Sequence, residues 1–587
     1  MARTVQLIFL AFFTLSSFSV CANPSKSLIS FSNKQPLRHQ QMMKDLEFMT
    51  NIFHFTYGPA EWKAEHFGWN LSEEISKAKH SVMGNHSLTQ KEFHQIVRNF
   101  CMTTKDYHVV PQFYSTELST LPFNIQSAEG KYFITFVDQK AYFNLEEFPL
   151  ELGDQVLLID GKPVEQVVEE FRQKEIGSNN RETDQALAEL YLTTRLGCSG
   201  HEVPKGDVKI TYCKSFTDEP MVFSVSWDYH PEILSIAGVP DRTKSLTRAV
   251  QIPLEKYSYR KQFMTPHYNL IRSVRADNNE PSDLLGAKKS MIPPLGVVLW
   301  ETPEKSPFHA YLFCLEDWSV AGYIRIPSYY VDGDSAAAEF AEIIELFQEV
   351  SDVLVVDQLN NGGGLVLYLY ALAAMLTDYD LDVPMHRVMM TQEDVYKAAE
   401  SSHILESIKN DRSARKIIGE TLEGVVVDYN LAKGLLAADR FIINQWNSGK
   451  LFTDYHYLYG IEKITPHPEV NYTKPILILT NSLDFSAADF FPAIMQDNHR
   501  AKVMGSRTSG AGGYVERVAF PNLNGIEEIA LTASFAMRKN GLPLENFGTT
   551  PDIPYVVSQN DLQNNYVDYK KKIINELSLL LPTSKGK

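Results

Sequence analysis

One serine in this chain has the local surroundings of a nucleophile. A buried strand is predicted by the apolar run "KPILILT", which leads directly into "NSLDFSAADFFP", the start of a helix rich in small residues. Ser486 lies at or near the first turn of that helix. It is either an ordinary N-cap or, if Asp484 is the cap, a hydroxyl beside uncommitted backbone N–H groups that can stabilise an oxyanion. The pattern therefore fits acyl transfer as well as simple capping.

A glycine loop is a second candidate for oxyanion donation. It consists of Gly362–Gly364 in "DQLNNGGGLVLY", between a predicted strand and a predicted helix. Glycine permits positive φ and exposes backbone N–H groups. A P-loop would end in Gly-Lys-Ser/Thr and a dinucleotide loop would contain Gly-x-Gly-x-x-Gly, and this stretch has neither. The loop is therefore an oxyanion donor or merely a tight turn.

A serine nucleophile also needs a base, and the sequence offers a candidate histidine. His108 follows a helical pattern in "TTKDYHVV", beside Asp106, and Glu545 lies in "GLPLENFGTTPDIP" near the C-terminus. Each of these residues, taken alone, fits an ordinary structural role. The chain contains no Cys-x-x-Cys and no His-Glu-x-x-His, so we expect neither a metal nor a cofactor.

The elements that must position these residues fall into three regions. Residues 36–118 show the apolar spacing of helices, and strand patterns take over from about residue 121. From about residue 291, strands alternate with helices, which is typical of a layered α/β core with sites at the carboxyl ends of its strands. In the middle region, a hairpin that turns at Asp160-Gly161 is predicted by "DQVLLIDGKPV". This stretch resembles the carboxylate-binding-loop region of a PDZ domain, and the alternative is an arbitrary β-hairpin.

The composition limits the function classes. With 587 residues, 44% of them hydrophobic, the chain can bury a sizeable core, and its net charge of −17 argues against nucleic acid or an anionic membrane as the main partner. Residues 1–22 have the pattern of a secretory signal, so we expect export and no stable membrane anchor. The remaining cysteines are too few and too scattered for a disulfide scaffold, and their disulfide state stays open: Cys101, Cys198, Cys213 and Cys314.

An internal segment differs in charge from the rest of the chain. Residues 241–290 hold ten Lys/Arg against five acidic residues, and they contain Pro253, Pro266 and Pro281 with weak periodicity. This composition predicts a long loop or linker. Two interpretations remain open, a solvated surface insertion or a segment that covers an acidic site and is cut out.

Taken together and in this order, these segments resemble the tricorn and C-terminal-processing serine peptidase family. The family's motifs correspond, along the chain, to Asp106-Tyr107-His108, Asn361-Gly362-Gly363-Gly364, Ser486, Gly505-Ser506-Arg507-Thr508-Ser509-Gly510 and Gly548-Thr549-Thr550-Pro551-Asp552. Two small departures are Gly362, where relatives have proline, and Val109, where they have a small polar residue.

A third departure decides which base the resemblance implies. The processing proteases carry a base lysine in a Gly-Lys-Gly turn, which here is Gly510-Ala511-Gly512. Alanine cannot accept a proton, so a serine–lysine dyad is excluded at this position. The tricorn-like branch uses serine, histidine and glutamate, which implies a triad of Ser486, His108 and Glu545 with oxyanion donors at Gly363 and Ala487.

The resemblance also implies an architecture. The expected fold class is multi-domain α/β, with a crotonase-like α/β catalytic core, an N-terminal helical region and a PDZ-like β-rich domain. The expected boundaries are 1–22 for the signal peptide, 23–120 for the helical region with the histidine, 121–235 for the PDZ-like domain, 236–290 for an inhibitory linker and 291–587 for the core.

The function that the resemblance implies is that of a secreted serine endopeptidase acting on host proteins. The resemblance implies a homodimer that is made as a zymogen, activated by self-cleavage in residues 236–290 and delivered to the host cell cytosol. Two alternatives share the fold. One is a periplasmic C-terminal-processing protease, which the PDZ-like pattern favours, and the other is a binding protein, which would be expected to lack catalytic residues. An α/β-hydrolase esterase would need Gly-x-Ser-x-Gly, which does not surround Ser486.

Overall fold

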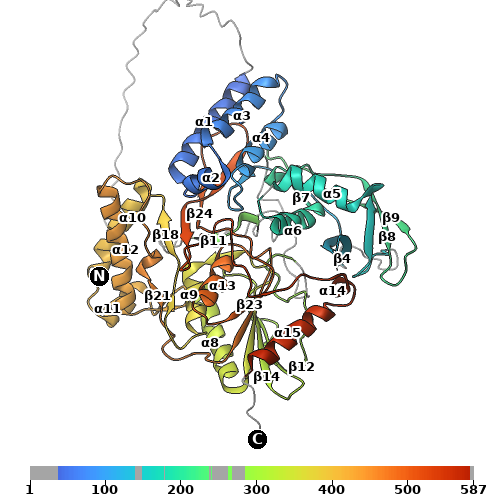
Figure 1. The fold of residues 1–587 in the computed structure, drawn as a ribbon. Coiled ribbons are helices and arrows are strands. Elements are labelled where there is room, and N and C mark those ends of the chain that lie inside the picture. The colour runs from blue at the N-terminus through green and yellow to red at the C-terminus, as the bar shows by residue number, and fades with distance from the viewer. Residues whose placement is uncertain are drawn as a thin grey trace, which may run out of the picture.

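The computed structural model describes residues 37–138, 148–177, 179–236, 240, 262–267 and 284–581, and the structural statements below concern these residues. The predicted signal peptide and most of the predicted inhibitory linker lie outside them. Figure 1 shows a helical region at the N-terminus, a β-rich domain on one side and an α/β core. The predicted α/β fold class with these three parts is confirmed.

The N-terminal region is built from four helices, α1 (Leu37–Thr56), α2 (Ala60–Phe67), α3 (Leu71–Gly84) and α4 (Gln90–Met102). In α1, Met42, Leu46, Met49 and Phe53 follow the three- and four-residue spacing of one helical face, and all are buried. Their cluster continues into Ile529 and its neighbours near the C-terminus of the chain. Burial of this apolar face therefore joins the N-terminal helices to residues 526–531, far along the chain.

The β-rich domain contains a sheet in the order β3-β4-β5-β8-β9, with β6 paired to β5. Asp160 and Gly161 both have positive φ, 50° and 78°, between the paired strands β5 and β6, so the predicted hairpin is confirmed. The elements of this domain are β2 (Leu118–Thr120), β3 (Phe123–Ala128), β4 (Lys131–Val137), β5 (Gln155–Ile159), β6 (Lys162–Pro163), α5 (Val164–Phe171), α6 (Arg181–Leu192), β7 (Thr194–Leu196), β8 (Asp207–Cys213), β9 (Met221–Ser226) and β10 (Asp228–His230).

The core is built on a seven-stranded sheet in the order β12-β13-β14-β15-β22-β23-β27. The pairs from β14 to β27 are parallel, while β12, β13 and β14 are antiparallel. The strands are β12 (Val297–Glu301), β13 (His309–Cys314), β14 (Val320–Arg325), β15 (Val353–Asp357), β22 (Ile476–Thr480), β23 (Lys502–Gly505) and β27 (Ile553–Pro554). Every residue of β15 and β22 is buried, because helices cover both faces of a parallel sheet.

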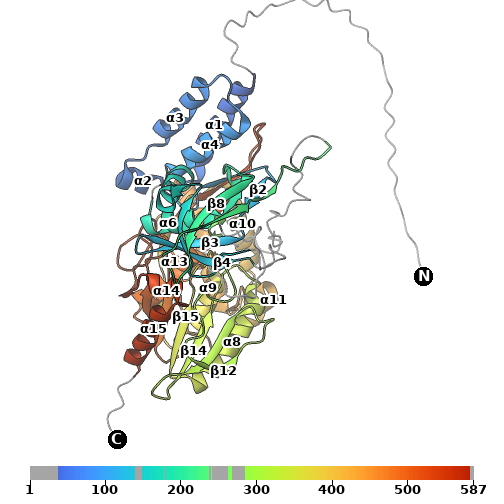
Figure 2. The ribbon, with the colours of Figure 1, turned by 90° about the vertical axis from the view of Figure 1, so that its right-hand side faces the viewer.

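Two groups of helices cover this sheet (Figure 2). One apolar cluster packs α8 (Gly333–Val350), α9 (Val366–Ala374) and α13 (Ala487–Asp497) against one face. A second cluster packs α14 (Gln559–Gln563) and α15 (Val567–Leu580) against the other. The predicted layered core is therefore confirmed.

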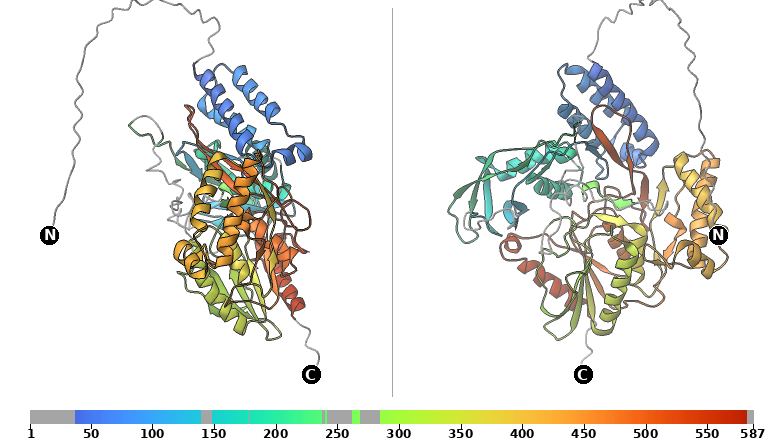
Figure 3. Two further views of the ribbon diagram at one scale, coloured as in Figure 1. Left: turned by 90° about the vertical axis from the view of Figure 1, so that its left-hand side faces the viewer. Right: turned by 180° about the vertical axis from the view of Figure 1, so that it is seen from behind.

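A helical insertion between β15 and β22 lies on the opposite side of the core from the β-rich domain (Figure 3). The helical and strand patterns of the sequence analysis did not distinguish it. It consists of α10 (Gln392–Leu405), α11 (Asp411–Ile418) and α12 (Tyr429–Asn447), with the short strands β17 (Leu381–Asp382), β18 (Met385–Val388), β19 (Thr421–Leu422), β20 (Val425–Val426) and β21 (Lys463–Ile464). Strand β18 pairs with β26 (Ser534–Met537), which fastens the insertion to the C-terminal part of the chain.

A second sheet gathers strands from distant parts of the chain in the order β1-β25-β24-β11-β16. Strand β1 follows His108, β16 is the end of the glycine loop, and β11 comes from the internal basic segment. The strands are β1 (Val110–Phe113), β11 (Gln262–Met264), β16 (Gly363–Leu365), β24 (Val515–Val518) and β25 (Ile526–Thr532). This sheet brings the candidate histidine and the glycine loop to the same part of the molecule.

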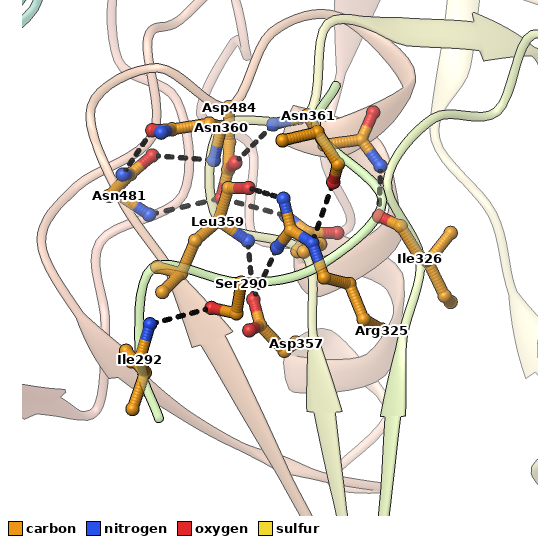
Figure 4. Close-up of polar contacts among 12 residues, drawn as sticks. Ser290, Ile292, Arg325, Ile326, Asp357, Leu359, Asn360, Asn361, Asn481 and Asp484 are labelled. Carbon is orange, nitrogen blue, oxygen red and sulfur yellow. Dashed lines mark hydrogen bonds and ion pairs between the residues drawn. The ribbon is translucent and has the colours of Figure 1, made fainter. Parts of the chain in front are cut away.

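A buried ion pair holds the carboxyl ends of two core strands. The Arg325 guanidinium at the end of β14 donates to Asp357 Oδ1 of β15 at 3.0 Å, and neither side chain is exposed to solvent. Its other nitrogens donate to the carbonyl oxygens of Ala287 and Leu359, each at 2.9 Å (Figure 4). The pair therefore fixes the backbone that leads into the glycine loop.

We predict that Arg325→Met lowers the free energy of unfolding by about 3–5 kcal/mol, because it leaves the Asp357 carboxylate buried without its cation. Denaturant unfolding of the full chain measures this loss. The control is Lys397→Met, which removes an exposed ion pair with Glu393 and is expected to cost less than about 1 kcal/mol. Equal losses in the two variants would contradict the role given to the buried pair.

Candidate active site

Ser486 is the N-cap residue of α13, six residues after the last residue of β22. Of the two sequence interpretations, the structure therefore has the serine itself at the cap position. Its backbone has φ 60° and ψ −115°, a region that a serine rarely adopts. The side chain is fully buried, and its hydroxyl has no hydrogen-bond partner among the described residues. The strained turn thus displays an uncommitted hydroxyl at the start of a helix.

Asp484 does not cap the helix but joins the serine turn to the glycine loop. Its carboxylate accepts the backbone N–H groups of Asn361 and Asn481, each at 3.0 Å (Figure 4). The Phe485 N–H donates to the Asn361 carbonyl at 2.8 Å. Burial raises the pKa of Asp484 well above its ordinary value, and the N–H donors oppose this rise.

The carboxylate of Asp489, one turn into α13, organises the other side of the serine. It accepts the backbone N–H of Ser486 at 2.7 Å, of Gly510 at 2.8 Å and of Ala511 at 3.0 Å. It also accepts the hydroxyls of Thr508 and Ser509. One buried carboxylate therefore couples the turn of Ser486 to residues 508–511.

The glycine loop is held in a conformation that requires glycine. Gly363 and Gly364 have φ 90° and 154°, and a Cβ on Gly364 would lie 1.9 Å from the carbonyl carbon of Tyr329. The Gly363 N–H, one predicted oxyanion donor, donates to Asn361 Oδ1 at 2.8 Å in this structure. Ala487, the other predicted donor, is the first residue of α13, where a backbone N–H lacks an intrahelical acceptor.

The side chain of His108 is fully buried. Its ring nitrogens have no hydrogen-bond partner among the described residues. Burial lowers the pKa of His108 to about 4, Asp106 opposes the shift, and the cation of Lys63 adds to it. Asp106 itself accepts the backbone N–H of His108 at 2.9 Å and the hydroxyl of Thr532 at 2.8 Å, so it fastens the histidine segment to β25.

Glu545 is a buried carboxylate with two partners. Oε1 contacts Lys63 Nζ at 2.5 Å, and Oε2 accepts the backbone N–H of Gly512 at 3.0 Å. Burial, followed by the nearby Asp106, raises the pKa of Glu545 to about 7, while Lys63 lowers it. A Cβ on Gly512 would lie 2.2 Å from the Glu545 backbone nitrogen, so glycine is needed for this approach.

The structure brings the three predicted triad segments to one place but does not hydrogen-bond the three side chains to one another. The ring of Tyr107, next to His108, packs edge-on against Phe485, next to Ser486, with centroids 5.7 Å apart. On the other side, Asp489 and Gly512 connect the serine turn to Glu545 through residues 510–512.

Part of the internal basic segment lies against this site. Strand β11 pairs antiparallel with β16, and the Thr265 N–H donates to the Gly362 carbonyl at 2.9 Å. His267 hydrogen-bonds the Tyr191 hydroxyl at 2.9 Å, and its ring lies 6.2 Å from that of Phe485. Burial lowers the pKa of His267 to about 4. The edge of the glycine loop is thus occupied by residues of the chain itself.

Two residues of the site, Asp489 and Lys63, were missed from the sequence. Asp489 had a usable signal, because Ser486 and Asp489 have the spacing of a capping box. Lys63 had none, since it lies in an unremarkable helical pattern far along the chain from its carboxylate partner.

A PDZ domain beside an α/β core with a buried, strained serine at a helix N-terminus defines a class of serine peptidases. Comparison of the chain with known protein families agrees with this. Residues 117–236 match the PDZ domain, and residues 320–555 match peptidase family S41. A Chlamydia muridarum protein is 34% identical over 91% of this chain and 92% of its own length, and one from Chlamydia trachomatis serovar D is 32% identical over the same shares.

Solved structures give the same result. The crystal structure of mature CPAF, the chlamydial protease-like activity factor, is 30% identical, covers 94% of this chain and 99% of its own, and has a TM-score of 0.80. A serine-to-alanine variant of CPAF has a TM-score of 0.83 over the same shares. The chain belongs to peptidase family S41 and has the CPAF fold, and it is a serine peptidase.

Neither a membrane span nor a metal site was found in the described part of the chain. No helix there combines the length and apolarity needed to cross a bilayer. The described histidines, cysteines and carboxylates form no group that could hold a metal ion.

We predict that Asp489→Asn lowers the free energy of unfolding by about 2–4 kcal/mol, because the amide NH₂ faces backbone N–H donors that the carboxylate satisfied. The matched control is Asp394→Asn in the exposed capping box of α10, for which a loss of about 1 kcal/mol is expected. Thermal and denaturant unfolding compare the two variants, and a smaller loss for Asp489→Asn would refute its organising role.

Proposed function

We propose that this serine peptidase is an endopeptidase in which Ser486 is the nucleophile, His108 the base and Glu545 the residue that orients the imidazole. The observation that carries the proposal is Ser486 at the N-terminus of α13. Its backbone is strained, and its buried hydroxyl has no hydrogen-bond partner among the described residues. Support also comes from Ala511, which lies where processing relatives have a base lysine. With no lysine there, the base has to come from another segment, and His108 has free ring nitrogens in the described structure.

The proposed reaction follows the logic of other serine triads. Ser486 Oγ attacks the carbonyl carbon of the scissile peptide, and one His108 ring nitrogen takes the hydroxyl proton. The Ala487 and Gly363 N–H groups then stabilise the oxyanion of the tetrahedral intermediate, once Gly363 turns from Asn361. His108 returns the proton to the leaving amine, and the imidazolium is stabilised by the Glu545 carboxylate. Water hydrolyses the acyl-enzyme by the same steps.

We propose further that the chain is made as a zymogen. The support is the position of β11, which pairs with the glycine loop, and of His267, which lies beside Phe485. Cleavage within residues 236–290 would release this segment from the glycine loop. The loop could then rearrange so that the Gly363 N–H leaves Asn361 and His108 and Glu545 approach each other. Export by residues 1–22, dimerisation and action on host proteins belong to the same proposal and rest on resemblance to the family.

A C-terminal-processing protease is the second candidate, because the chain carries a PDZ domain. The two functions differ in what the substrate must present. An endopeptidase cuts internal bonds whether or not the substrate has a free C-terminal carboxylate. Cleavage of one peptide in its free-acid and C-terminally amidated forms therefore separates them.

We expect Ser486→Ala and His108→Ala to lose about 10⁶-fold in turnover and Glu545→Gln to lose less, because the orienting carboxylate takes no part in bond making. The measurement is cleavage of a denatured protein by the processed enzyme and its variants. Comparable activity in all four would show that the triad is wrong or the activity is a contaminant. A folded, processed wild type without activity would favour a binding protein.

Self-cleavage gives a separate prediction. Intact-mass analysis of purified full-length protein is expected to find cuts between about residues 235 and 295 that are absent in Ser486→Ala. Adding a trace of processed wild type to the Ser486→Ala chain should produce the same cuts in trans. An intact chain with full activity would sink the zymogen proposal.

A further inference from the structure

A fully buried lysine lies at the centre of the candidate site. Lys63, in α2, is 0% exposed, and its Nζ donates to three acceptors from two other segments. The distances are 2.5 Å to Glu545 Oε1, 2.8 Å to Asn546 Oδ1 and 2.8 Å to the Lys105 carbonyl oxygen. One side chain therefore connects the segment that leads to His108 with the loop that carries Glu545.

The contacts identify the state of this side chain. An ammonium has three N–H donors and no lone pair, and all three donors of Lys63 have an oxygen acceptor. A neutral amine would direct a lone pair at one of these oxygens. These contacts match the three N–H donors of an ammonium, which has no lone pair to take a proton from Ser486. Lys63 does not replace the base lysine that Ala511 lacks.

We propose that Lys63 is a positioning residue whose ammonium keeps the Glu545 carboxylate ionised and holds it beside the His108 segment. This inference rests on the proposed triad and extends it to a fourth residue, contributed by the N-terminal helices.

The charges around Glu545 explain why a cation is needed there. The segment before β1 contributes Asp106, His108 and Lys105. The residue after α1 contributes the Tyr57 hydroxyl, and the Gly512 turn contributes a neutral N–H. The Lys105 ammonium faces away, over the ring of Phe67 at 4.5 Å. Two carboxylates, Asp106 and Glu545, thus share a dry site in which the Lys63 ammonium is the cation that contacts Glu545.

The sign of the pH effect follows from these contacts. A nearby cation lowers the pKa of a carboxylate and of an imidazole, and Lys63 acts in this direction on both Glu545 and His108. Without the ammonium, both groups bind protons at higher pH. Catalysis needs Glu545 ionised and His108 neutral, so the acid limb of the pH–rate profile is expected to move upward. Glu545→Gln removes a carboxylate that favours the imidazolium form of His108. The acid limb, then set by His108 alone, is expected to move to lower pH.

The experiment compares kcat/KM against pH for the processed enzyme and five variants, Lys63→Met, Lys63→Arg, Glu545→Gln, Lys63→Met with Glu545→Gln, and Trp62→Phe. Lys63→Met is expected to lose at least about tenfold in kcat and to raise the midpoint of the acid limb by about one pH unit or more. Lys63→Arg keeps the charge and is expected to keep the midpoint. Trp62→Phe is the matched control, because it removes a neutral N–H donor to the same Asn546 at 3.1 Å.

The double variant separates positioning from general support of the fold. If Lys63 acts through Glu545, Lys63→Met costs less than about threefold further when Glu545 is already glutamine. If Lys63 only supports the fold, its loss is the same in both backgrounds, and the inference is wrong. If the Lys63→Met single variant does not fold, two measurements still decide between these outcomes. One compares Glu545→Gln with the double variant, and the other is the pH profile of Lys63→Arg.

Failure of the inference differs from failure of the proposed function. An active Ser486→Ala or His108→Ala enzyme would overturn the triad and with it the role of Lys63. An inactive Ser486→Ala enzyme beside a Lys63→Met enzyme with the wild-type rate and acid limb would leave the triad in place and overturn only the role of Lys63.

Discussion

The arrangement of the site depends on one buried carboxylate, that of Asp489. Five donors reach it, from Ser486, Thr508, Ser509, Gly510 and Ala511. A buried charge is tolerated only when it is well hydrogen-bonded, so the position of each donor is tightly restricted. The strained backbone of Ser486 is maintained because its N–H has a strong acceptor there. The same carboxylate sets the turn whose next residue, Gly512, binds Glu545, so Ser486 and Glu545 are placed from one point.

The second constraint is that the site is assembled from both ends of the chain. Apolar side chains of α1 and α4 pack on β25, and Asp106 bonds the hydroxyl of Thr532 in that strand. Lys63 then adds a charged connection between α2 and the Glu545 loop. Burial of apolar side chains supplies most of the free energy that holds the N-terminal helices on the core. The polar contacts fix the position of the helices, because each contact forms in only one geometry. An active site divided in this way is sensitive to any change in how the N-terminal helices dock.

The sequence predicted the features that are local or periodic. The layered core, the hairpin at Asp160-Gly161 and the serine at the start of α13 follow from apolar period, turn chemistry and capping residues within a few positions of one another. The bonding of Glu545 to Lys63 could not be predicted, because the two are nearly the whole chain apart and neither has a local signature. The hydrogen bond from the Gly363 N–H to the Asn361 side chain was missed for a related reason. The sequence of a loop does not determine which backbone N–H its side chains accept.

The pairing of β11 with the glycine loop shows how a weak contact can hold a protease inactive under the proposed function. Strand β16 is fixed on one side by Tyr329, whose backbone bonds Gly363 and Leu365, and its other edge pairs with three residues of β11. An extended substrate that needs this edge competes with β11. Three residues offer only a few hydrogen bonds of about 1 kcal/mol each, too little to hold a separate peptide. While the segment is part of the chain, its effective concentration at the edge is high, and cuts on both sides of β11 would remove that advantage without breaking any contact in the site. Under the proposed function, such cuts outside the site would be sufficient to free this edge.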